Sequence, residues 1–406
     1  MTKKVLIVAE NFPPNGVTSS RRPGEMAKYL PNFGWTPIVI TSKWRPDNCN
    51  YDPSIVPNIQ EDLVKYETES SKPHAFQKLT EQVIRVLQPQ RHPYSRLKST
   101  QKKIEYVLKN EKIDAIWVTV PPFNLLEATS IIASKKKIPW IADFRDAWQF
   151  APNQFVRLTM ASRLKYEREL LMSAAAITTV STGFAETLQK RHNRLIQTIP
   201  HGFDPELNLN TSNEYPEIFN IVFTGGAVLG KPNFRPLLDA IGKLIQDGKI
   251  IEEKIRIDFF GAGNSVALAR MFENHKYANL VKDYGPIPRI KAIENQRKAA
   301  ILLAAGHPGA KGVITSKIFE YITAGRPILS IPKDNDCIDE LLEKTNCGVS
   351  CTTTEEIKIA VLELYKKWES GELSNIPSSE QVLLYSSHAR AKELANLLNE
   401  VTGLGK

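Results

Sequence analysis

Three turns along this 406-residue chain carry residue types that suit an anionic ligand. The first, AENFPPNGVTSSRRPGE, holds a tight Asn15-Gly16 turn, then hydroxyl and guanidinium groups at a predicted helix start. The second, FTGGAVLGKPNFR, follows a predicted strand and carries Gly225, Gly226 and Lys231. Glycine turns, helix N-termini and cations all attract phosphate groups. The alternative for the first turn is that its Ser and Thr residues only cap the helix and its arginines lie on the surface.

The third turn lies in GVITSKIFEYITAGRPILSIP, residues 312–332. Thr315, Ser316 and Lys317 would form the first turn of a helix, whose N–H groups and dipole favour a diphosphate. Glu320 lies one turn further along the same face. A carboxylate there could accept hydrogen bonds from two ribose hydroxyls, so this stretch predicts a nucleotide site. The alternative is a solvated helix face.

A further charged cluster, Asp143, Arg145 and Asp146, follows a predicted strand in WIADFRDAW. Carboxylates at the carboxyl end of such a strand are candidates for acid–base chemistry. The alternative is an internal Arg–Asp pair that fixes the loop. The DND run at Asp334–Asp336 has the spacing of a metal-binding pair, but it begins a predicted helix and is interpreted as capping.

Short apolar runs alternate with helical patterns along the chain, which predicts an α/β protein with parallel sheets. The rhythm restarts near residue 206, so we expect two Rossmann-like doubly wound domains facing each other across a cleft. The predicted domains are 1–205 and 206–406, and a C-terminal helix at about 380–402 is expected to pack back on the first. In such folds ligands bind beyond the carboxyl ends of the strands.

Composition limits where the protein acts. No apolar run reaches the ~18 residues that span a bilayer, and the N-terminus reads as a buried strand rather than a signal peptide. The four cysteines form no ligand cluster, which favours a reducing cytoplasm. Residues 76–112 carry nine Lys and Arg against three Glu, interleaved with apolar residues. This segment predicts either contact with an anionic membrane surface or a basic helix pair packed on its own domain.

Eight segments in order resemble the GT-B glycosyltransferases, most closely the retaining, nucleotide-sugar-dependent family-4 type that builds bacterial surface polysaccharides. The segments are KVLIVAENFPPNGVTSSRR, IPWIADFRDAW, ITTVSTGFAETL, IPHGFDPE, FNIVFTGGAVLGK, IDFFGAG, YGPIPRIKAIENQRKAAILL and TSKIFEYITAGRPIL. The second resembles an Asp-Phe-Arg-Asp-Pro-Trp segment of that family, with Ala147 in place of the usual proline. The resemblance covers nearly the whole chain.

The resemblance implies roles for the donor-binding residues. Glu320 matches the second acid of an E-x(7)-E motif that binds the nucleotide ribose. Lys231 matches a lysine that binds the diphosphate, although its arginine companion would fall near Gly226. Gly16 matches a glycine whose backbone approaches the phosphates. The segment from Gly285 to Ile287 resembles a stretch whose main chain contacts the base.

Two positions depart from the family or bear on the sugar. The first acid of the motif would fall at Gly312, so His307, Lys311 or nearby backbone would have to replace it. Arg145 aligns with a histidine that contacts the donor sugar in many members. Asp146 and Asp143 are the candidates for a general base.

The function that the resemblance implies is a hexosyl- or hexosaminyltransferase that uses a nucleoside diphosphate-sugar, with a UDP-sugar favoured. Charge on the departing diphosphate would be stabilised by Lys231, Lys317, helix N–H groups and Arg21, without a metal or a cofactor. The expected acceptor is a glycan or a polyprenyl-linked glycan, and no nucleic acid is expected as a partner. The expected location is the cytoplasm, at the inner face of the plasma membrane if the basic segment binds lipid. The alternatives are a nucleotide-sugar epimerase of similar architecture and an inactive nucleotide-sugar-binding subunit.

Overall fold

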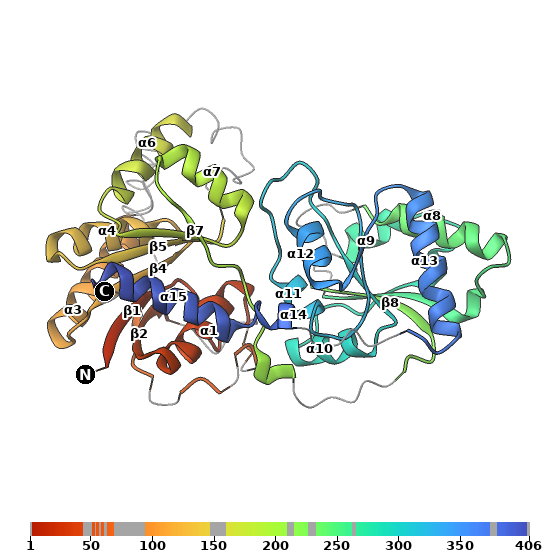
Figure 1. Ribbon diagram of the computed structural model, residues 1–406, viewed down its shortest axis with the longest axis horizontal. Coiled ribbons are helices and arrows are strands. Elements are labelled where there is room, and N and C mark those ends of the chain that lie inside the picture. Colours follow the sequence, from red (N-terminus) through yellow and green to blue (C-terminus); the bar gives the residue numbers. More distant parts are fainter. Residues whose placement is uncertain are drawn as a thin grey trace. The chain divides into compact units, whose positions relative to one another are not determined.

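The computed structural model describes residues 2–43, 51–52, 54–56, 58–60, 63–68, 94–146, 160–208, 215–225, 233–261, 265–373 and 380–403. The chain divides into two compact units (Figure 1). The first unit comprises residues 1–201 together with 387–406, and the second comprises residues 202–386. Each unit is built around one parallel sheet.

The sheet of the first unit has seven strands in the order β3-β2-β1-β4-β5-β6-β7. The strand order reverses at β1. This strand pairs in parallel with β2 on one side and with β4 on the other. The strands are β1 (Lys3–Val8), β2 (Trp35–Ser42), β3 (Lys65–Thr68), β4 (Ala115–Val120), β5 (Trp140–Phe144), β6 (Ala176–Thr179) and β7 (Gln197–Thr198).

Alternate residues of β1 pack in two separate cores, because successive side chains in a strand point to opposite faces of the sheet. Val5 and Ile7 pack with α1 (Arg21–Tyr29) and α15 (Ser387–Val401). Figure 1 shows these two helices side by side although they come from opposite ends of the sequence. Leu6 and Val8 pack in the other core, on the side of helices α3 (Tyr94–Asn110), α4 (Asn124–Lys136), α6 (Met160–Leu171) and α7 (Thr182–His192).

The sheet of the second unit has six strands in the order β10-β9-β8-β11-β12-β13. Its order reverses between β8 and β11, the equivalent of the reversal in the first sheet. The strands are β8 (Phe219–Thr224), β9 (Ile255–Phe260), β10 (Val281–Asp283), β11 (Ile301–Ala304), β12 (Ile328–Ser330) and β13 (Gly348–Ser350).

Helices cover both faces of this second sheet too. Ile221 and Phe223 of β8 pack in the core that includes α8 (Arg235–Gln246) and α13 (Thr354–Glu369). Val222 points to the opposite core, which includes α11 (Lys317–Tyr321) and α12 (Cys337–Thr345). The remaining helices are α9 (Ser265–Phe272), α10 (Arg289–Lys298) and α14 (Glu380–Leu383). The predicted fold class, two doubly wound α/β sheets, is therefore confirmed.

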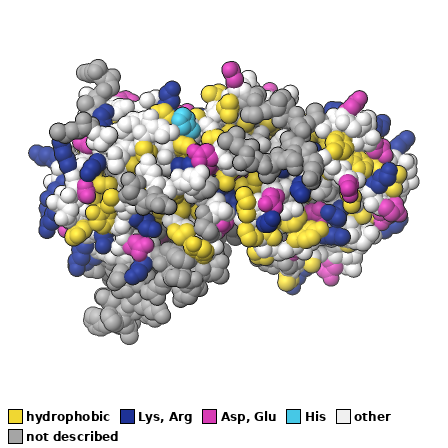
Figure 2. Space-filling model, turned by 90° about the horizontal axis from the view of Figure 1, so that it is seen from below, with side chains coloured by type: hydrophobic (Ala, Val, Ile, Leu, Met, Phe, Trp, Pro, Cys, Tyr) yellow, Lys and Arg dark blue, Asp and Glu magenta, His cyan; other side chains and the backbone are white. Residues whose placement is uncertain are grey.

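The basic segment 76–112 is described only from residue 94 onward. Within α3 the apolar residues Leu97, Ile104 and Val107 are buried in the core of the first unit, so the packed-helix interpretation holds for this part. Its lysines remain on the surface, and Figure 2 shows Lys and Arg side chains gathered over the end of the view that holds the first unit. Among the described residues no helix is long and apolar enough to cross a membrane.

Candidate functional site

Three glycine turns meet at the carboxyl edge of the second sheet. Gly225 follows β8 with φ +86°, and its N–H donates to the Phe260 carbonyl at 2.7 Å. Gly261 follows β9 with φ +77°, and its N–H donates to the Gly285 carbonyl at 2.6 Å. A Cβ on Gly261 would lie 3.4 Å from the Gly225 nitrogen, so the two turns approach closely. Positive φ and close approach both favour glycine, and Gly225 is exposed at this edge.

Lys317 extends from the start of α11 to the Gly225 turn. Its Nζ lies 3.8 Å from the centre of the Phe223 ring, and a Cβ on Gly225 would be 3.6 Å from that Nζ. Desolvation by the surrounding protein lowers the pKa of Lys317 to about 7, although nearby Glu320 opposes this shift. A lysine in such a position gains from a bound anion, because the anion favours its charged form.

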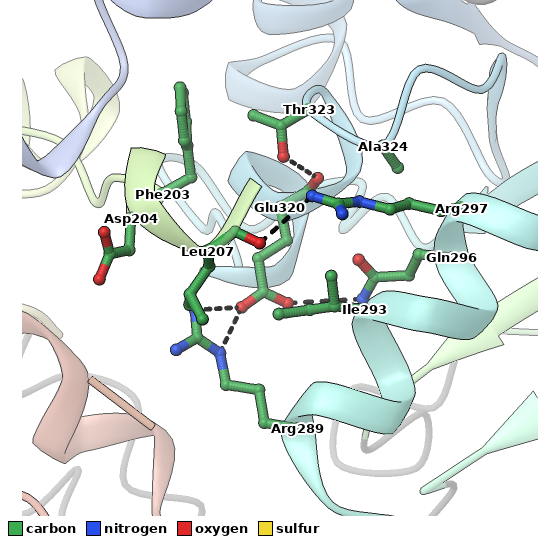
Figure 3. Close-up of a pocket in the computed structure, with 10 residues that line it drawn as sticks. All are labelled: Phe203, Asp204, Leu207, Arg289, Ile293, Gln296, Arg297, Glu320, Thr323 and Ala324. Atoms are coloured by element: carbon green, nitrogen blue, oxygen red, sulfur yellow. Dashed lines mark hydrogen bonds and ion pairs between the residues drawn. The ribbon is translucent and has the colours of Figure 1, made fainter. Parts of the chain in front are cut away.

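Glu320 lies one turn after Lys317 and points into a small pocket (Figure 3). The Arg289 side chain, from the start of α10, donates from Nε and Nη2 to Oε1 of Glu320, each at 2.8 Å. The side chains of the pair are only 9% and 12% exposed. The pocket is lined by Phe203, Asp204, Leu207, Arg289, Ile293, Gln296, Arg297, Glu320, Thr323 and Ala324.

A hydrogen-bond network ties Glu320 to the end of β8. Gln296 Nε2 donates to Thr224 Oγ1 at 2.9 Å and lies 3.4 Å from Oε2 of Glu320 (Figure 3). The Thr224 N–H donates to the hydroxyl of Tyr321 at 2.8 Å, and burial raises the pKa of that hydroxyl to about 12. Residues from β8, α10 and α11 are therefore linked directly behind the Glu320 carboxylate.

The members of this network that were not among the predicted site residues are Arg289, Gln296, Tyr321 and Thr224. Arg289 is 31 residues from Glu320 in the sequence, and no local pattern pairs them. The available signal was limited to polar residues on α10, a helix directly after the segment Gly285 to Ile287.

The remaining predicted donor residues of the second unit occupy the same edge where they are described. Thr315 and Ser316 directly precede α11, and the Ser316 side chain makes no capping bond to the helix. Ile287 follows β10 and packs against the core that contains α11. Gly226 and Lys231 lie outside the described residues.

Gly312, where the resemblance would place a second acid, has a backbone that suits glycine. Its φ is +82°, a left-handed conformation that side chains disfavour. Its N–H donates to Oδ2 of Asp336. Asp334 accepts bonds from the N–H groups of Ile338 and Asp339 at 3.0 and 3.2 Å. The capping prediction for the DND run is thus confirmed for Asp334, while Asp336 holds the Gly312 turn instead.

His307 lies close to Lys317 and Asp334, which both influence its charge. Desolvation, helped by Lys317, lowers the pKa of His307 and favours its neutral form. In the described part of the chain its buried Nε2 has no hydrogen-bond partner. His307 therefore offers an unsatisfied polar atom near the Lys317 side chain.

In the first unit, Asp143 forms a closed ion pair. Arg22 donates from Nε and Nη2 to its two carboxylate oxygens at 2.9 and 2.8 Å. The hydroxyls of Thr119 and Thr178 donate to the same oxygens at 2.8 and 2.7 Å. Asp143 has no exposed surface. This is the internal pair that sequence reasoning gave as the alternative, although it is made by Arg22 and not by Arg145.

Arg145 and Asp146 continue from the end of β5. Arg145 donates from Nη2 to the Pro121 carbonyl, and burial lowers its pKa. Within the described residues its Nε has no hydrogen-bond partner. The Asp146 side chain is exposed. Desolvation by nearby protein nevertheless raises its pKa, and the charge of Arg145 opposes this shift. Of the two predicted acids here, Asp146 is the one with an exposed side chain.

The Gly16 turn is held by side-chain hydrogen bonds among its polar residues. Asn11 Nδ2 donates to Ser19 Oγ at 2.8 Å, and Asn15 Nδ2 donates to Asn11 Oδ1 at 3.0 Å. Arg21 pairs with Glu25 at 3.3 Å on the following helix. His201, also in this unit, is kept neutral by burial and by the Arg22 and Arg145 charges, which place its pKa well below the usual value.

Across the described ranges, no group of three or more His, Cys, Asp or Glu side chains is arranged to hold a metal ion.

Residues 20–207 match the model of Glycosyltransferase Family 4. No curated protein matches the chain. Solved structures match over almost their whole length at low identity. They include a glycosyltransferase from Rickettsia africae (15% identity, TM-score 0.66, 98% of each chain). Sucrose-phosphate synthase from Thermosynechococcus elongatus gives 13% identity, a TM-score of 0.68 and 99% of each chain. Anabaena HepE with UDP and glucose gives 13% identity and a TM-score of 0.65, with 98% of this chain and 100% of that one covered.

Proposed function

We propose that this chain, whose residues 20–207 belong to Glycosyltransferase Family 4, transfers a sugar from a nucleoside diphosphate-sugar to a glycan or polyprenyl-linked acceptor. The observation that carries the proposal is the joint position of Gly225, Lys317 and Glu320 at the carboxyl edge of the second sheet. An exposed glycine turn that a ligand can approach, a cation and a carboxylate are features that suit a diphosphate and a ribose.

The chemistry of the site follows from the charge that develops on the leaving group. Breaking the bond at the anomeric carbon leaves negative charge on the nucleoside diphosphate, and Lys317 gains its full charge as that anion approaches. Glu320 accepts hydrogen bonds from the ribose hydroxyls and so fixes the nucleotide. Retention at the anomeric carbon and a hexosyl or hexosaminyl donor remain parts of the proposal that rest on the family resemblance.

Other residues take supporting roles in this proposal. Asp146 is the candidate general base and Arg145 the candidate sugar contact, whereas Asp143 fixes the loop through Arg22. Gly16, Gly226 and Lys231 are proposed to contact phosphate groups. A UDP-sugar is the preferred donor class, a choice supported by the similar HepE structure, which binds UDP and glucose.

The experiment that tests the function is a thermal-shift screen against UDP, GDP, ADP and their sugars. A ligand that binds the native state alone raises the melting temperature with its occupancy. We expect one nucleotide family to do so, with sugar transfer from the corresponding donor. If none of these ligands shifts the melting temperature and no donor is turned over, the proposal fails. Sugar isomerised without an acceptor would indicate an epimerase instead.

The assignment of Glu320 has its own test. Glu320→Ala should weaken UDP binding by about tenfold or more, since one or two hydrogen bonds to a charged group are lost. The matched control is Glu294→Ala on α10, which should leave the affinity unchanged. The Glu294 carboxylate pairs with the exposed Lys291. Both variants are compared by calorimetric titration after circular dichroism has shown that they fold. Unchanged affinity in Glu320→Ala would remove Glu320 from the site.

A further inference from the structure

We propose that Arg289 is a positioning residue that makes the donor site selective for ribose over 2′-deoxyribose. Its guanidinium holds the Glu320 carboxylate in the orientation that receives the ribose hydroxyls. This inference rests on the proposed function, because it assumes that Glu320 contacts the nucleotide.

The geometry of the pair favours orientation over simple charge balance. Arg289 donates from two nitrogens to the same Glu320 oxygen, each at 2.8 Å. Two N–H groups of one planar guanidinium give this contact a direction that a single point charge lacks. Because both side chains are mostly buried, little water reaches the pair to replace this restraint.

The position of Arg289 in the chain connects two parts of nucleotide recognition. Arg289 is the first residue of α10 and follows the segment Gly285 to Ile287, which is proposed to contact the base. The Gly285 carbonyl is fixed by the N–H of Gly261. Gln296, on the same helix, lies 3.4 Å from the other Glu320 oxygen. One helix thus contacts both oxygens of the carboxylate (Figure 3). The same helix begins two residues after the segment that is proposed to contact the base.

A purely structural ion pair would behave differently. Arg289 and Glu320 both line a small pocket, so the pair is not enclosed on every side as a purely structural pair would be (Figure 3). A held carboxylate selects a sugar by hydrogen bonds at defined positions, and loss of the 2′-hydroxyl removes one of them. A carboxylate that is not held by Arg289 can change rotamer. Its hydrogen bond to the 2′-hydroxyl then contributes less to binding.

The test measures the ratio of affinities for UDP and 2′-deoxy-UDP by calorimetric titration. We expect the wild-type protein to prefer UDP by about tenfold or more, and Arg289→Ala to prefer it by less than about threefold. Arg289→Lys should recover part of the preference, because it restores the charge without the paired donors. The control Arg270→Ala, at an exposed position of α9, should keep the wild-type ratio. In the double variant Arg289→Ala, Glu320→Ala, the ratio should equal that of Glu320→Ala alone.

The outcomes separate this inference from the function itself. If wild-type protein binds neither nucleotide, the proposed function is at fault. If wild-type binds UDP and Arg289→Ala keeps the full preference, the inference is overturned while the function stands. An equal loss of affinity for both nucleotides in Arg289→Ala would also overturn it, because Arg289 would then support binding or folding in general.

Discussion

Two arginine–carboxylate pairs in this protein use the same chemistry in opposite surroundings. The Arg22–Asp143 pair of the first unit is 3% and 0% exposed, and Asp143 accepts bonds from Arg22, Thr119 and Thr178. These bonds account for the acceptor capacity of a carboxylate, about four sites. The Arg289–Glu320 pair of the second unit is 9% and 12% exposed and lines a pocket.

This difference distinguishes an acid that stabilises the fold from an acid that can bind a ligand. Asp143 lies near the carboxyl end of β5 and Glu320 in the first turn of α11, and functional acids are common at such positions. Asp143 cannot accept a ligand without losing a protein bond, whereas Glu320, which is bonded to Arg289 and Gln296, also lines a pocket. We therefore expect substitutions at the first pair to change stability and substitutions at the second to change binding.

The largest expected effect comes from breaking the closed pair. Asp143→Asn leaves the buried Arg22 charge without its anion, which should lower the free energy of unfolding by about 3–5 kcal/mol. Glu320→Gln should lower it by less, about 1–2 kcal/mol, because both side chains of that pair keep some exposure and line a pocket. Urea denaturation followed by circular dichroism measures both. Equal losses of unfolding free energy at Asp143 and Glu320 would show that the two pairs do not differ in their contribution to stability.

A matched surface variant checks that the loss at Asp143 reflects burial. Glu67→Gln breaks the Lys65–Glu67 contact, whose side chains are 33% and 34% exposed. Its loss should be no more than about 0.5 kcal/mol.

A smaller effect is expected from pH on nucleotide binding at the site that contains Lys317 and Glu320. Desolvation lowers the pKa of Lys317 to about 7, so this side chain is mostly neutral above that pH in the empty site. A bound diphosphate favours the charged form, and binding therefore takes up a proton. Affinity for UDP-glucose should fall as the pH rises from 7 to 9, at most about tenfold per pH unit for a single proton.

The measurement is calorimetric titration at several pH values in two buffers of different ionisation enthalpy. Lys317→Met should bind more weakly at pH 7 and lose most of the pH dependence. Lys249→Met, at an exposed lysine, should behave as the wild type. A pH dependence that survives in Lys317→Met would assign it to another group.

The fold could be predicted because it depends on local patterns. Apolar strands such as β1, followed by helices with one apolar face, dictate doubly wound sheets, and both sheets have the expected parallel order. The edge that carries Gly225, Lys317 and Glu320 followed from the same reasoning, since parallel strands end at one side of a sheet.

Partners across long sequence distances could not be predicted. Arg22 reaches Asp143 over 121 positions, and Arg289 reaches Glu320 over 31. Charge and periodicity fix which face of an element is polar, but not which opposite charge the packed neighbour presents. The basic pattern of α3 illustrates the same limit, because its interleaved apolar residues belong to the core.

The smallest expected effect comes from placing a second acid at Gly312, near the site that contains Lys317 and Glu320. The family resemblance places a second glutamate at Gly312, but the backbone there has φ +82°, and its N–H is bound by Asp336. Gly312→Glu should therefore lower the free energy of unfolding by about 1 kcal/mol without tightening UDP-glucose binding. Gly312→Asn, a residue that tolerates this conformation better, should be closer to the wild type in stability. Urea denaturation and calorimetric titration test both points. A stable Gly312→Glu variant with higher affinity would show that the site accepts a second carboxylate, and that its backbone conformation does not explain the glycine.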